Sequence, residues 1–290
     1  MAQNHLLAYG AMQDSTRESG GVTPGQADRE YLPAWHAMFT NIPGNYLRFG
    51  RDVLKPEAIP IIIAVTASTA ILIVTDEETY RWHERAYLTS PVTKDVSDIA
   101  VWIGDGRPQF GLAAAFGLYG FVANDARSLR TASQIVEAIL SVGIIVQILK
   151  HTTGRESPLV STIPGGRWQW FPNQIEYHKH VPHYDAFPSG HVATALATFT
   201  VIAENYPEIW WIRPAGYALT GLLAVAMVNT GIHWYSDYPL AIAMGYSFGM
   251  IAAHPVGMSL GSESTNSHVQ FSILPYISSG QNGVEVVLSF

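Results

Sequence analysis

The sequence predicts an all-α bundle of six membrane-spanning helices with a small C-terminal extension. Three observations lead to this fold class. Of the 290 residues, 48% are hydrophobic and only 13% are charged, about half the charge of a typical soluble domain. The hydrophobic residues gather in six blocks along the chain. The strongest blocks have the length that a helix needs to cross about 30 Å of hydrocarbon.

Three of the six blocks carry the clearest signal. Ala58–Thr75 and Pro214–Ile232 contain no charged residue, and Thr131–Leu149 contains one, Glu137. We expect Glu137 to face the bundle, because an ionisable group facing lipid is costly. The weaker blocks are Ile99–Ala123, Gly190–Ala203 and Tyr238–Ala253. The alternative is a large soluble protein with six buried helices, although uncharged stretches of about 18 residues are uncommon in soluble cores.

The blocks divide the chain into four segments. Residues 1–30 are polar and are expected to form a flexible tail. Residues 31–56 mix aromatic and basic residues, which is typical of an amphipathic segment in the headgroup region. The six-helix domain occupies residues 57–254, and residues 255–290 form the extension. The expected strands of a C-terminal β-hairpin are His268–Pro275 and Val284–Phe290.

Composition excludes several classes of protein. A formal net charge of −7 argues against a nucleic-acid binder with a basic surface. The absence of cysteine excludes disulfides, thiolate zinc sites and iron–sulfur clusters. One face of the predicted bundle carries a weak excess of basic residues and is therefore expected to be cytoplasmic. These residues are Arg48, Arg51, Lys55, Arg127, Arg130 and Arg213.

Three short segments with reactive side chains stand at the ends of predicted helices. Lys150–Pro158 follows the third span, Pro188–His191 opens the fourth, and Gly231–Asp237 joins the fifth to the sixth. Because successive spans alternate in direction, all three segments reach the same membrane face. The predicted active-site loops therefore lie on the face opposite the basic residues.

The same segments contain the groups needed to bind a phosphoryl group. Ser189 and Gly190 open a helix, where free backbone amides and the helix dipole favour an anion. Lys150 and Arg155 add cationic donors. These four residues are the candidate phosphate-binding set.

A histidine–carboxylate couple and a second histidine make up the candidate catalytic set. His233 and Asp237 are four residues apart, so the carboxylate can accept the Nδ1 proton and leave Nε2 free as a nucleophile. His191 is the candidate general acid. We expect no metal and no cofactor, because this set performs phosphoryl transfer without either. The weaker alternative is a metal site built from the loop histidines His178, His180 and His183.

The three segments resemble the signature of the type 2 phosphatidic acid phosphatase superfamily, in its integral-membrane branch. That signature reads K-x6-R-P, then P-S-G-H, then S-R-x5-H-x3-D. The second motif is complete at Pro188–His191, and H-x3-D is complete at His233 and Asp237. Lys150 and Pro158 match the ends of the first motif. The resemblance covers the predicted six-helix domain.

The resemblance implies a membrane-bound phosphatase that hydrolyses a lipid phosphate monoester or diphosphate. In the family pattern His233 forms a phosphohistidine, Asp237 orients it, and His191 protonates the departing alcohol. The family also implies an active site that faces the periplasm or the exterior, and the expected location is a bacterial inner membrane with the site facing the periplasm. The expected partners are the lipid substrate and the bilayer, with no nucleic acid. The identity of the lipid and the oligomeric state stay open.

Two arginines of the family signature are absent from this chain. Ser157 stands at the first position, and Ala226 and Met227 replace the Ser-Arg pair of the third motif. Each lost charge-assisted contact costs about 1.5–3 kcal/mol, so the pair lowers transition-state stabilisation by ~10²- to 10⁴-fold. Two alternatives stay open. The lost arginines motivate the first, a weakened or inactive relative that binds or transports lipid phosphates. The second is a vanadium-dependent haloperoxidase-like enzyme, which the apolar spans and the two missing arginines disfavour.

Overall fold

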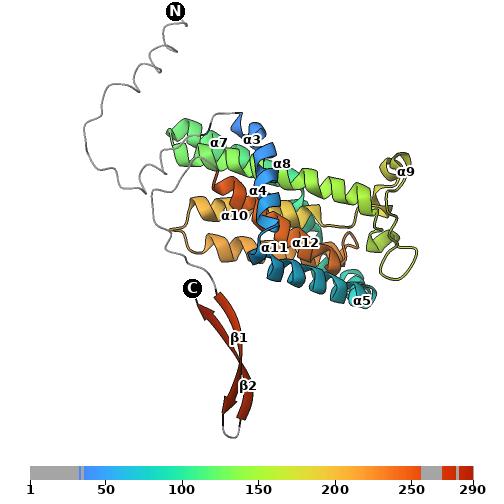
Figure 1. The fold of residues 1–290 in the computed structure, drawn as a ribbon. Helices are drawn as coiled ribbons and strands as arrows, with labels where there is room; N and C mark the ends of the chain where they lie inside the picture. The colour runs from blue at the N-terminus through green and yellow to red at the C-terminus, as the bar shows by residue number, and fades with distance from the viewer. Residues whose placement is uncertain (1–32, 34–35, 256–269, 279–280, 290) are drawn as a thin grey trace, which may run out of the picture. The chain divides into compact units, whose positions relative to one another are not determined.

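The computed structural model describes residues 33, 36–255, 270–278 and 281–289. They fall into two units, a helical one and one that contains a two-stranded hairpin. Each of the six apolar blocks forms helix over most of its length (Figure 1). The predicted flexible tail, residues 1–30, lies outside the described residues.

The helical unit begins with two short helices and continues with longer ones. The short elements are α3 (Ala37–Thr40), α4 (Ile42–Val53) and the 3-10 turn η1 (Pro56–Ala58). The longer helices are α5 (Ile59–Thr89), α6 (Pro91–Gly104), α7 (Gly106–Ala123), α8 (Ala126–Thr153), α10 (Gly190–Asn205), α11 (Ile212–Asn229) and α12 (Tyr238–Ala253). The connections contain η2 (Pro158–Val160), α9 (Gln174–Lys179), η3 (Val181–His183) and η4 (Tyr235–Asp237).

Side chains supply the hydrogen bonds that the backbone lacks at several helix ends. The N-terminal capping residues of α6, α7, α8 and α10 are Ser90, Asp105, Asp125 and Ser189. Asp105 thereby splits the predicted span Ile99–Ala123 into α6 and α7. α8 ends at Thr153 and is followed by Gly154, whose φ of 51° favours glycine. A Cβ there would lie 2.3 Å from the carbonyl oxygen of Gln169, so the turn after α8 also requires a residue without a side chain.

The core of the helical unit surrounds α8, which packs against α7, α10 and α12. Ile135 and Val142 of α8 are fully buried. Glu137 is also buried, and its carboxylate accepts hydrogen bonds from Asn41 (2.9 Å) and Asn45 (2.7 Å). The expectation that Glu137 faces the bundle is confirmed, since a buried carboxylate requires such partners. These bonds also fasten the predicted amphipathic segment to the bundle.

Within the described residues, two helices are long and apolar enough to cross a membrane. They are Pro56–Thr89 and Ala126–Thr153, with mean hydropathies of 2.3 and 1.9. In the most apolar stretch of the first helix no residue is buried inside the protein, whereas 44% of the corresponding stretch of the second helix is buried. The structure thus shows that the six predicted spans are helical, but it does not show that all six cross the membrane. α10 and α12 have 16 residues each, or about 24 Å, and the α6–α7 pair is broken.

The C-terminal hairpin consists of β1 (Gln270–Ser278) and β2 (Gln281–Ser289), which pair antiparallel. Ser278 stands opposite Gln281 beside the turn. Both strands reach three residues closer to the turn than the sequence predicted. Asn282 and Gly283, which lie between the two expected strands, therefore pair within β2.

Candidate active site

The three reactive segments meet at one end of the helical unit. α8 ends there, α10 begins there, and residues 230–237 join α11 to α12. Two backbone hydrogen bonds hold the segments together. The amide of Ser189 donates to the carbonyl of Asp237 (3.1 Å), and the amide of Leu159 donates to the carbonyl of Gly231 (3.0 Å). The prediction that the segments share one end is confirmed.

The two candidate catalytic imidazoles lie side by side. The ring centroids of His191 and His233 are 6.0 Å apart, although the rings come from the start of α10 and from the loop after α11. Asp237 Oδ2 lies 3.4 Å from His233 Nδ1 and accepts the Trp234 amide at 2.8 Å. Among the described residues neither ring nitrogen of His233 has a hydrogen-bond partner. The structure therefore brings all three candidate catalytic residues together.

Two of the four candidate phosphate-binding residues are placed for that role. Lys150 is 5% exposed, and its ammonium lies 3.4 Å from a carboxylate oxygen of Asp185. A Cβ on Gly190 would lie 4.0 Å from Lys150 Cε, so the lysine reaches the start of α10. The amide of Gly190, the first residue of α10, has no acceptor within the helix. The amide of Ser189 is already used by Asp237, so this residue caps the helix and does not offer its amide to an anion.

Arg155 lies where it cannot contact a phosphoryl group. Its side chain is fully buried. Nη1 donates to Asp237 Oδ1 (2.5 Å), and Nη2 donates to Asp76 Oδ2 (2.8 Å). The ring of Trp168 lies 4.7 Å from the guanidinium carbon. The predicted contact between Arg155 and a phosphoryl group does not fit this placement, because two carboxylates already bind the guanidinium.

Asp76 is the residue that the sequence analysis missed. It belongs to α5 and is 1% exposed. Its carboxylate accepts the amide of Ser236 at 3.2 Å and also the Ser236 hydroxyl. A signal for it existed in the sequence, since Asp76 is the first charged residue after the uncharged block Ala58–Thr75, where that helix arrives at the active-site end.

One family model matches the part of the chain that contains the candidate site. Residues 131–259 match the sequence profile of the PAP2 superfamily, and this range contains every candidate site residue. The part of the chain that holds the candidate site is therefore similar to the PAP2 superfamily. The two long apolar helices and this similarity point to an integral membrane protein. No curated protein matches the sequence.

Two solved structures are similar to this chain. One is Aquifex aeolicus LpxE, with 20% identity, a TM-score of 0.45, and coverage of 60% of this chain and 92% of that chain. The other is the first transmembrane PAP2-type phosphatidylglycerolphosphate phosphatase from Bacillus subtilis. Its identity is 14%, its TM-score is 0.46, and the match covers 66% of this chain and 92% of that chain.

Both positions that lack the PAP2 arginine are buried. Ser157 is 3% exposed, and its amide donates to the carbonyl of Pro182. Met227 is fully buried and packs in the hydrophobic core. No cation therefore stands at either position. Lys150 is the candidate phosphate-binding cation that the geometry leaves in place.

Glu156 binds the loop after α8 to the candidate site. Its carboxylate accepts the amides of Thr162 (2.8 Å) and Arg167 (3.0 Å), and its carbonyl accepts Trp234 Nε1 (2.8 Å). Burial acts to raise the pKa of the Glu156 carboxyl, but these amide bonds and the Arg167 charge outweigh it, so the pKa is lowered. The ionised form of Glu156 therefore stabilises the folded loop.

Replacing Glu156 by Gln should lower the unfolding free energy by about 1.5–3 kcal/mol at neutral pH, because charge-assisted hydrogen bonds are lost. A carboxyl with a depressed folded pKa stabilises the protein above its unfolded pKa of about 4.3 and loses that contribution as pH falls. The difference in thermal midpoint between wild type and E156Q should therefore shrink below about pH 4. E176Q, in the exposed part of the same loop, is the control. An equal E156Q deficit at both pH values would contradict the assignment.

An apolar groove of about 560 Å³ adjoins the site. It runs along α8 between α7 and α10. Its lining residues are Phe110, Ile139, Leu140, Gly143, Ile144, Gln147, Ile148, His151 and Thr194. His151 follows Lys150 in the chain and Thr194 lies one helical turn from His191, so the groove begins beside the polar groups.

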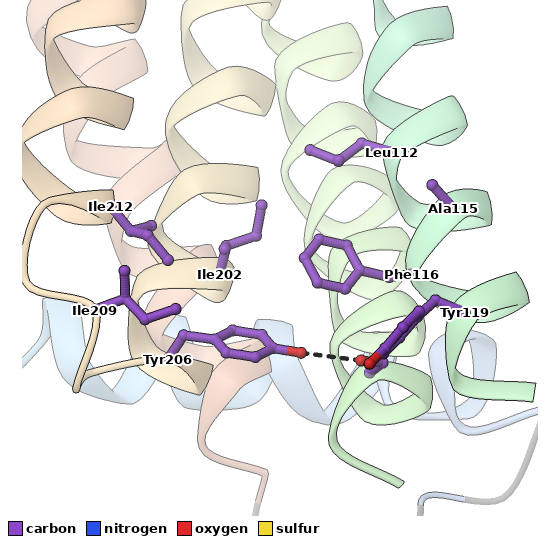
Figure 2. Close-up of a pocket in the computed structure, with 9 residues that line it drawn as sticks. Leu112, Ala115, Phe116, Tyr119, Ile202, Tyr206, Ile209 and Ile212 are labelled. Atoms are coloured by element: carbon purple, nitrogen blue, oxygen red, sulfur yellow. Dashed lines mark hydrogen bonds between the residues drawn. The ribbon is translucent and has the colours of Figure 1, made fainter. Parts of the chain in front are cut away.

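A second apolar pocket, of about 420 Å³, lies at the opposite end of α10 (Figure 2). Side chains of α7 and of residues 202–212 point into it, and the Tyr206 hydroxyl lies 3.1 Å from Ser128 Oγ. None of the candidate catalytic or phosphate-binding residues lines it. This pocket is therefore separate from the active site.

Proposed function

We propose that the protein is an integral-membrane phosphatase that hydrolyses a phosphate monoester or diphosphate of a lipid through a phosphohistidine at His233. The observation that carries this proposal is the 6.0 Å separation of the His191 and His233 rings, which two different helix ends bring together. Asp237 lies beside His233, and Lys150 and the start of α10 at Gly190 lie nearby. The match of residues 131–259 to the PAP2 superfamily supports the reaction class.

The reaction follows from the positions of these groups. Nε2 of His233 attacks the phosphorus in line, and a P–N bond forms as the P–O bond to the leaving alcohol breaks. Protonated His191 gives its proton to the departing oxygen. Neutral His191 then takes a proton from water, whose oxygen attacks the phosphorus and breaks the P–N bond. Asp237 holds the Nδ1 proton of His233 and offsets the positive charge that forms on its ring.

Several features favour a lipid as the substrate. The apolar groove beside the site is suited to a hydrocarbon chain. Trp170 and Phe171, in the loop on the active-site end, are 65% and 77% exposed, as is typical of side chains at a membrane interface. In this proposal α5, the α6–α7 pair, α8, α10, α11 and α12 cross the bilayer, and the active site faces the periplasm of a bacterial inner membrane.

Phosphate release by the purified protein tests the proposal. The substrates are phosphatidate, phosphatidylglycerol phosphate, a polyprenyl diphosphate and a lipid A phosphate, each presented in mixed micelles. We expect release from at least one of them, together with a protein-bound phosphate that is stable in base and labile in acid. Folded protein that releases phosphate from none of the four would contradict the hydrolase assignment.

Treatment with a metal chelator should leave this activity unchanged. Lys150 and the helix start at Gly190 supply the positive potential that the phosphoryl group requires, so the proposed mechanism has no step for a metal. The measurement is initial rate before and after chelation, and again after Mg²⁺, Mn²⁺ or Zn²⁺ is added back. Activity that disappears and returns with a metal would contradict metal independence and direct attention to the loop histidines.

A second candidate function is binding of lipid phosphates without turnover. It is favoured by the two buried positions without arginine, Ser157 and Met227, and by the pairing of Arg155 with carboxylates. Such a protein would bind the same lipids with no phosphate release and no covalent phosphate. Binding and release measured on one preparation separate the two functions.

A further inference from the structure

The buried carboxylate of Asp76 has no part in the mechanism described above, and it lies in none of the three PAP2 motifs. Of α5, which the structure describes in full, only Asp76 and Tyr80 are buried. A buried carboxylate is costly unless it is paired, so its partners indicate what it does. Those partners are Arg155 and Ser236, and both belong to the surroundings of the catalytic couple.

Arg155 bridges two carboxylates that come from different parts of the chain. One terminal nitrogen donates to Asp76 of α5, and the other donates to Asp237, four residues after His233. Ser236 completes the network, because its hydroxyl accepts from Arg155 (2.6 Å) and donates to Asp76. All four side chains of this network, Asp76, Arg155, Ser236 and Asp237, are at most 1% exposed. Interactions between charges are strong at such burial.

We propose that Asp76 is a positioning residue that acts through Arg155 to keep Asp237 effective towards His233. This inference rests on the proposed function. Asp237 Oδ1 is held by Arg155, while Oδ2 faces the Trp234 amide and Nδ1 of His233. The orientation of the Asp237 carboxylate is thus fixed from two sides, and its Oδ2 is held 3.4 Å from His233 Nδ1.

The charges of the network explain why a second carboxylate is present. Arg155 alone would neutralise Asp237 and weaken it as the partner of the His233 proton. Asp76 and Asp237 both pair with the Arg155 guanidinium. The two carboxylates and one cation therefore give the network beside the His233 imidazole a net charge of −1. That charge stabilises the positive ring that forms when His233 is phosphorylated.

The test uses Asp76→Asn in the full-length protein with the lipid that the wild type hydrolyses. Asn keeps the shape and an acceptor for the Ser236 amide but removes the charge. We expect kcat to fall roughly 10- to 100-fold with KM unchanged, because Asp76 lies behind Arg155 and does not contact the substrate. The matched control is Ser236→Ala, which removes hydrogen bonds and keeps every charge, and we expect a smaller fall in kcat.

Single-turnover kinetics with enzyme in excess separate positioning from misfolding. If D76N only leaves a fraction of the molecules unfolded, the single-turnover rate at saturating enzyme stays at the wild-type value, and a higher total protein concentration is needed to reach it. If Asp76 positions the couple, the saturating rate itself falls. Either a wild-type saturating rate or an increase in KM alone would overturn the proposal.

The double variant Asp76→Asn/Arg155→Gln provides a second readout that depends on the sign of the charge. In this variant Asp237 is the one charged side chain left in the network, so the net charge is again −1. The variant should therefore recover part of the kcat that D76N loses. A purely structural role predicts a double variant that is less active than D76N, and that result would also overturn the inference.

A wild type without activity on any lipid phosphate would instead refute the proposed function, and this inference with it. An active wild type with an unaffected D76N would refute this inference alone.

Discussion

Replacing His233 by alanine should abolish phosphate release and the protein-bound phosphate together. Without its nucleophile the enzyme cannot form the covalent intermediate. We therefore expect kcat to fall by at least about 10⁴-fold. His233 is 1% exposed, and the truncation leaves Asp237 without its imidazole partner. The measurement is a time course of free phosphate and of acid-labile phosphate on the protein, with the lipid that the wild type hydrolyses.

A histidine far from the site serves as the control for this variant. His254 follows α12 at the opposite end from Asp237, and its ring lies near Glu204. His254→Ala should retain the covalent phosphate and the wild-type rate of phosphate release. That result would show that the loss of activity is specific to His233 and does not follow from removing any histidine. Equal release by wild type and H233A would contradict the covalent mechanism and would favour direct attack by water.

The sequence predicted the helical architecture and the meeting of three segments because both depend on local patterns. Apolar blocks define helices, and alternation of direction brings every second helix end to the same side. The same reasoning predicts that the segments with His191 and His233 reach one end of the bundle, where the two rings lie 6.0 Å apart. The end of α5 was less predictable. This helix continues past Thr75 because its charged residues form favourable pairs along the helix, such as Glu77 with Arg81 at 2.6 Å.

The roles of Arg155 and Asp76 depend on contacts over long sequence separations and were therefore not predictable. Arg155 stands two residues before the expected arginine position, so proximity in sequence indicated a phosphate ligand. The turn at Gly154 is followed by backbone that pairs with Trp168, and the guanidinium is buried between carboxylates 79 and 82 residues away. A spacing pattern gives neither the direction of a side chain nor its distant partners.

Replacing His191 by alanine should have an effect that depends on the leaving group. For a lipid phosphate, whose alkoxide leaves poorly without a proton, loss of the general acid should lower kcat/KM by about 10²- to 10⁴-fold. For p-nitrophenyl phosphate, whose leaving group needs no proton, the first step should slow by less than about tenfold. Because His191 also activates water in the second step, p-nitrophenol should appear in a burst that matches the amount of enzyme, and phosphohistidine should accumulate. A H191A variant that slows both substrates equally and traps no phosphohistidine would show that His191 only shapes the start of α10, where it lies in the first turn.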